Sequence, residues 1–140
     1  MNMKNKLNIT IDDFPFTHEI KTRWRDLDAF RHVNNATFLS YIEDARILFF
    51  KRWSINLKEK SLIVASVKID YISQLEHPSD IIIGQKISRI GTKSFDVQSA
   101  IFTKNNKRLV CTSTVTTVCF NFLKNKSVEV FKEIKEDYNG

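Results

Sequence analysis

The chain has 140 residues, of which 42% are hydrophobic and 27% charged, and its formal net charge at pH 7 is +6. This composition excludes a disordered chain, and we expect a single domain over residues 1–140. No apolar run is long enough to span a membrane and the N-terminus has no signal-peptide core, which predicts a cytoplasmic protein.

The first predicted elements are a polar leader, a strand and a long helix. Residues 1–13 are polar and are expected to be partly loose. Residues 17–24 have the two-residue side-chain pattern of a strand, and a charged segment follows that is not predicted to be regular structure. Residues 35–53 are predicted to form the one long helix, with Asn34 or Asn35 as its N-cap. Its apolar face is formed by residues three or four apart: Phe38, Ile42, Ala45 and Phe49.

Four further strands and a short helix are predicted after the long helix. The strands are segments rich in Ile, Val, Thr and Phe: residues 61–73, 80–90, 93–104 and 107–120. Short turns at residues 90–92 and 104–107 make the neighbouring strands antiparallel. Residues 127–138 are predicted to be an amphipathic helix capped by Ser127.

These elements predict an α+β protein. We expect an antiparallel sheet of about five strands wrapped around one long central helix, with a short C-terminal helix. Alternation of Ala65, Val67, Ile69 and Tyr71 with polar residues predicts a half-buried strand. A single open sheet leaves its edge strands unpaired, and two copies pairing edge to edge would close that gap. The layout therefore predicts a homodimer or a homotetramer.

Several classes of function are disfavoured by the motifs that the sequence lacks. Three Gly leave little room for a phosphate-binding loop, and no Walker, G-x-S-x-G, H-E-x-x-H or C-x-x-C motif is present. Cys111 and Cys119 are separated by roughly 26 Å in one predicted strand, too far for a disulfide. No zinc pattern exists, so no metal or cofactor is expected. The basic residues are dispersed, which argues against nucleic-acid binding.

The densest polar cluster, residues 25–35, lies between the first predicted strand and the long helix. It contains Asp26, Asp28, His32 and two asparagines. The unpaired N–H groups of a helix N-terminus can hold an anion or a developing oxyanion, which favours an acyl-transfer site. A purely structural interpretation stays open, in which Asp26 caps a turn, His32 is a loop histidine and the asparagines only cap the helix.

Two motifs carry a resemblance to a known family. The first is Trp24-Arg25-Asp26-Leu27-Asp28, followed after three residues by His32-Val33-Asn34-Asn35, and the second is Gly91-Thr92-Lys93-Ser94-Phe95. With them the sequence resembles the hotdog-fold acyl-CoA thioesterases of the 4-hydroxybenzoyl-CoA thioesterase group, which is related to the acyl-carrier-protein thioesterases. The resemblance covers nearly all of residues 17–135 and implies the hotdog fold.

The resemblance also implies roles for the residues of the first motif. Asp28 takes the place of the family's catalytic carboxylate, which attacks the thioester directly or acts as a base toward water. The backbone N–H of Asn35 takes the place of the donor that polarises the thioester carbonyl, and Asn34 beside it is predicted to bind substrate. His32 is assigned a loop-shaping role first and a catalytic role second.

The remaining predicted substrate-binding residues are Lys93, Ser94 and Arg31. Lys93 and Ser94 correspond to a stretch that lines the pantetheine and nucleotide path in relatives, where Lys93 either pairs with a CoA phosphate or is only a turn lysine. Arg31 stands where many relatives carry Gly, and its bulk would narrow the entrance or reach toward the ligand. Phe30 stands where the plant carrier-protein thioesterases have an Asn, two residues after the catalytic aspartate.

The resemblance therefore implies a thioester hydrolase that converts acyl-CoA to a free acid and CoA. Two alternatives stay open. The same fold could act on acyl-carrier protein, since a basic surface suits an acidic carrier. It could also bind acyl thioesters without cleaving them, because a fold does not guarantee an activity.

Overall fold

The computed structural model describes residues 8–140, so the first seven residues of the predicted leader lie outside the described part. Six strands form one antiparallel sheet with the order β1-β3-β4-β5-β2, and β6 pairs with β5. The strands are β1 (Phe16–Lys21), β2 (Ser61–Tyr71), β3 (Asp80–Ile90), β4 (Ser94–Thr103), β5 (Leu109–Asn121) and β6 (Lys126–Ser127). The helices are η1 (Ile11–Asp13), η2 (Trp24–Asp26), α2 (Asn35–Phe50) and α3 (Lys132–Asn139).

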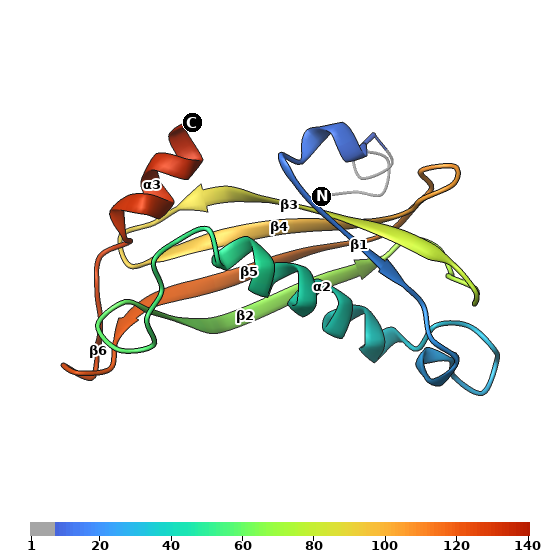
Figure 1. The fold of residues 1–140 in the computed structure, drawn as a ribbon, viewed down its shortest axis with the longest axis horizontal. Coiled ribbons are helices and arrows are strands. Elements are labelled where there is room, and N and C mark those ends of the chain that lie inside the picture. Colours follow the sequence, from blue (N-terminus) through green and yellow to red (C-terminus); the bar gives the residue numbers. More distant parts are fainter. Residues whose placement is uncertain (1–7) are drawn as a thin grey trace.

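The long helix α2 lies along one face of the curved sheet (Figure 1). Its buried residues pack against the central strands: Phe38, Tyr41, Ile42 and Ala45 contact Ile81 and Ile83 of β3, Ile101 of β4, and Cys111 of β5. A second cluster joins Phe49 and Trp53 to Phe95, Cys119 and Ile134. This arrangement of a sheet around a central helix confirms the predicted hotdog fold.

Both cysteines are free and buried, in agreement with the spacing argument. The predicted turns at residues 90–92 and 104–107 connect β3 to β4 and β4 to β5. Among residues 8–140, neither α-helix has the length and apolar content that crossing a bilayer requires.

Three element predictions differ from the structure. Trp24 belongs to η2, not to the first strand, and its side chain is exposed. The long helix ends at Phe50, three residues early, although Trp53 is still buried. Ser127 is not a helix cap, because it pairs with Phe120 in the sheet while α3 starts at Lys132 after the N-cap Phe131.

Strand β2 was predicted to bury one of its two faces, but most of its residues are exposed. It lies at the edge of the sheet, with β5 as its one neighbour, and its register shifts between Val64 and Ser66. Val67 and Tyr71 are 46% and 41% exposed. A single chain therefore leaves this apolar strand largely uncovered.

Candidate active site

The loop between η2 and α2 folds back on itself and presents Asp28. An isolated bridge joins Leu27 to Val33. Within it, the Asp28 N–H donates to the His32 carbonyl at 2.8 Å, and the Arg31 N–H donates to the Asp28 carbonyl at 3.2 Å. The loop is thus a closed, hydrogen-bonded turn that ends where α2 begins.

The Asp28 carboxylate is half-buried and held by backbone donors. Its Oδ1 accepts from the N–H of Phe30 at 2.8 Å and from that of His32 at 3.2 Å. Within residues 8–140 its Oδ2 accepts no hydrogen bond, and the His32 ring makes none either. Asp28 is therefore oriented through one oxygen while the other stays available for chemistry.

Helix α2 begins with two asparagines that have different roles. Asn34 is the N-cap, since its Oδ1 accepts from the Ala36 N–H at 2.9 Å. Asn35 is the first helical residue, and in the described part of the chain its own N–H has no acceptor. An unpaired N–H at the positive end of a helix is suited to a negatively charged oxygen.

Asp26, two residues before Asp28, is buried and serves the structure. It accepts from the Tyr41 hydroxyl at 2.6 Å and from the Arg23 N–H at 2.8 Å, and the Arg23 guanidinium pairs with it. Burial alone would raise the pKa of Asp26, but the hydrogen bonds from Tyr41 and Arg23 outweigh burial and lower it. Burial and Asp26 together raise the pKa of Tyr41. The structure therefore agrees with the structural interpretation for Asp26.

A cleft of about 510 Å³ opens beside the loop. One wall comes from the loop and from α2, with Asp28, His32 and Asn35 among its residues. The opposite wall is the end of β2 and the start of the β2–β3 connection, residues 71–75. The cleft is thus lined by Asp28, a carboxylate residue, and by Asn35, whose N–H is unpaired among residues 8–140. Groups of these two kinds can activate a nucleophile and stabilise an oxyanion.

The other four predicted site residues do not line this cleft. Asn34 is occupied as the helix cap. Arg31 is exposed and has a φ of 65°, in the left-handed region that favours glycine. Lys93 belongs to the β3–β4 connection and Ser94 is the first residue of β4. That connection lies near α3, at the other end of α2 from the loop (Figure 1). Ser94 Oγ accepts from Arg89, and Lys93 is exposed.

The cleft also contains residues that sequence reasoning did not single out for function. Tyr71 donates its hydroxyl to the Asn35 carbonyl at 2.8 Å, and Ser73 and Gln74 lie on the same wall. No spacing signal connects residues 71–75 with residues 28–35, because only the fold makes them neighbours. Among residues 8–140, no three His, Cys, Asp or Glu side chains are grouped to hold a metal ion.

Comparison with known proteins gives three kinds of match. A family model described as the thioesterase-like superfamily matches residues 22–137. YsmA of Bacillus subtilis (strain 168), an uncharacterized protein, is 32% identical over 83 residues, which are 58% of this chain and 56% of YsmA. The long-chain acyl-CoA thioesterase FadM of Escherichia coli (strain K12) is 24% identical over 84% of this chain and 92% of FadM.

Among solved structures, a thioesterase from Thermus thermophilus, complexed with coenzyme A and Zn, superimposes with a TM-score of 0.81. It is 28% identical, and the match covers 91% of this chain and 99% of that one.

Proposed function

The chain belongs to the thioesterase-like superfamily, and from that premise we propose that it hydrolyses acyl-CoA to a free acid and CoA. One observation carries the proposal: the carboxylate of Asp28 and the unpaired N–H of Asn35 open on the same cleft. The coenzyme A complex of the similar Thermus protein supports a CoA thioester as the substrate class.

The proposed reaction uses the Asn35 N–H to stabilise charge and the Asp28 carboxylate to supply or activate the nucleophile. The Asn35 N–H donates to the thioester carbonyl oxygen and stabilises the negative charge that develops there. As a base, Asp28 takes a proton from water, whose oxygen forms the new bond to the carbonyl carbon. The C–S bond then breaks, and the CoA thiolate leaves and takes up a proton. As a nucleophile, Asp28 instead attacks the carbonyl carbon itself and the C–S bond breaks, which releases the CoA thiolate and leaves an acyl anhydride with Asp28. Water then hydrolyses the anhydride to the free acid and the Asp28 carboxylate.

Replacement of Asp28 by Asn tests this proposal. Asn keeps an acceptor for the Phe30 and His32 amides but removes the base, so kcat on a responsive acyl-CoA is expected to fall by at least about a hundred-fold. The measurement is release of free thiol from a panel of short, long and aromatic acyl-CoAs. Asp44→Asn is the matched control, since Asp44 is exposed on α2 and does not line the cleft.

Two results would contradict the proposal. Undiminished turnover in the folded Asp28→Asn protein would exclude Asp28 as nucleophile or base. No turnover of any acyl-CoA by folded wild-type protein would exclude this substrate class and leave acyl-carrier protein or binding without cleavage.

A further inference from the structure

The β2–β3 connection forms a wall of the cleft and also holds the loop that presents Asp28. Its residues Ser73, Gln74 and Leu75 line the cleft. The Leu75 carbonyl accepts from the Val33 N–H at 2.9 Å, and Glu76 forms a bridge with His32. Residues 75–76 of the connection are therefore joined to residues 32–33 of the loop along the backbone.

Within the loop, His32 is in turn hydrogen-bonded to Asp28. His32 donates its N–H to Asp28 Oδ1, and its carbonyl accepts from the Asp28 N–H. Leu75 is fully buried, so the contact between connection and loop is packed as well as hydrogen-bonded. The connection, His32 and Asp28 thus form one chain of contacts.

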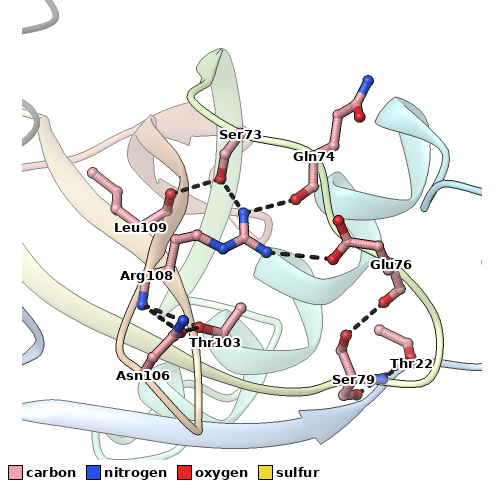
Figure 2. Close-up of polar contacts among 9 residues, drawn as sticks. All are labelled: Thr22, Ser73, Gln74, Glu76, Ser79, Thr103, Asn106, Arg108 and Leu109. Carbon is pink, nitrogen blue, oxygen red and sulfur yellow. Dashed lines mark hydrogen bonds and ion pairs between the residues drawn. The ribbon is translucent and has the colours of Figure 1, made fainter.

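Arg108 holds the connection through its guanidinium. Its Nη1 donates to Ser73 Oγ at 2.6 Å and to the Gln74 carbonyl at 2.8 Å, and its Nη2 lies 3.5 Å from Glu76 Oε2. Figure 2 shows the guanidinium at the centre of these contacts. One planar group therefore binds three residues of a four-residue segment, which a lysine ammonium does not reproduce.

The backbone of Arg108 is itself anchored at the start of β5. Its N–H donates to Thr103 Oγ1 at 3.0 Å, and its carbonyl accepts from the Thr103 N–H at 2.9 Å. Ser73 Oγ, which accepts from Arg108, donates in turn to the Leu109 carbonyl at 2.9 Å. Arg108 therefore reaches the connection from the β4–β5 hairpin, to which its backbone is hydrogen-bonded (Figure 2).

We propose that Arg108, which does not line the cleft, is a positioning residue that acts on Asp28 through the β2–β3 connection. This inference rests on the proposed thioesterase function of the cleft. Without Arg108, residues 73–76 lose their fixed position, and Asp28 loses its alignment with the Asn35 N–H. Small misplacements of reacting groups cost rate because the reacting atoms must meet in a narrow range of geometry.

The experiment compares Arg108→Met and Arg108→Lys with Arg52→Met. Arg52 is the matched control, because its guanidinium is similarly half-exposed and also makes several hydrogen bonds, to Asp137 and to the Phe49 carbonyl, away from the cleft. In Arg108→Met, kcat is expected to fall on the order of ten-fold. Its KM and melting temperature should change no more than those of Arg52→Met. Arg108→Lys should be intermediate, since it keeps the charge without the planar fork.

Amide hydrogen exchange gives a second readout that does not depend on activity. In Arg108→Met the amides of Phe30, His32 and Val33 should exchange faster than in wild type, and in Arg52→Met they should not. Unchanged kcat and unchanged exchange in Arg108→Met would overturn the inference. If wild type shows no turnover while exchange responds as expected, the proposed function fails and the coupling of Arg108 to the loop stands.

Discussion

Two aspartates only two residues apart, Asp26 and Asp28, have different surroundings. Asp26 is 2% exposed and is surrounded by donors from Tyr41 and Arg23. Asp28 is half-buried on the cleft and leaves one carboxylate oxygen without a hydrogen bond among residues 8–140. A saturated carboxylate stabilises the fold, whereas one with an open oxygen can accept a proton.

Replacement of Tyr41 by Phe tests the structural role of Asp26. The variant removes the donor at 2.6 Å from a buried carboxylate, so the free energy of unfolding at neutral pH should fall by about 1–3 kcal/mol. The pKa of Asp26 is lowered in the folded state, so its charge contributes stability above the unfolded pKa of about 3.9. That contribution is lost as the pH falls through the folded pKa, which lies below the unfolded value.

The difference in the free energy of unfolding between wild type and Tyr41→Phe should therefore be smaller at acid pH than at neutral pH. Urea unfolding at about pH 7 and about pH 3 measures it. Tyr138→Phe is the control, because Tyr138 is 46% exposed. Equal stability of the two variants at neutral pH would show that the Tyr41–Asp26 bond is not stabilising.

At the scale of elements, capping decides where α2 begins and therefore which N–H faces the cleft. The sequence left Asn34 and Asn35 as alternative caps. The structure selects Asn34, whose side chain accepts from Ala36, and thereby makes Asn35 the first helical residue. The position of one cap thus determines the residue whose N–H is available.

Asn34→Ala is expected to destabilise the protein by about 1 kcal/mol, because the Ala36 N–H loses its acceptor. Asn34→Asp keeps an acceptor oxygen and should unfold like wild type. Chemical denaturation of the three proteins makes the comparison. If the Ala and Asp variants unfold at the same denaturant concentration as wild type, the capping bond contributes nothing to stability.

At the scale of the whole molecule, the edge strand β2 leaves several apolar side chains exposed. Val64, Val67 and Tyr71 are more than a third exposed. Beside them, an apolar groove of about 630 Å³ runs between α2 and β2 and is lined by Ile47, Leu57 and Leu62, among others. An uncovered edge of this kind pairs readily with another strand.

We therefore expect two copies to pair through β2, and light scattering in solution should give at least twice the chain mass. Val67→Lys places a charge on the edge strand and should release single chains. Ser88→Lys adds the same charge at an exposed position of β3, which β4 and β5 separate from β2, and should leave the assembly intact. A wild-type protein that runs as a single chain would refute this expectation.

Much of the architecture follows from local pattern. The 3–4 spacing of Phe38, Ile42 and Ala45 predicts α2, and the β-branched segments and short turns predict the antiparallel strands. Local pattern failed at Ser127, where a good capping residue stays extended because strand pairing with Phe120 prevails over capping preference.

The sequence by itself determined the elements, their order and the cluster that contains Asp28, His32 and Asn35, since each depends on residues near one another in the chain. Only the tertiary structure decided that Asp26 is saturated while Asp28 has an open oxygen, that residues 71–75 face the cluster, and that Arg108 holds them. The contacts of Asp26 with Tyr41, of Tyr71 with Asn35 and of Arg108 with Ser73 join residues far apart in the chain, and they depend on how the sheet closes around α2 and not on local propensity.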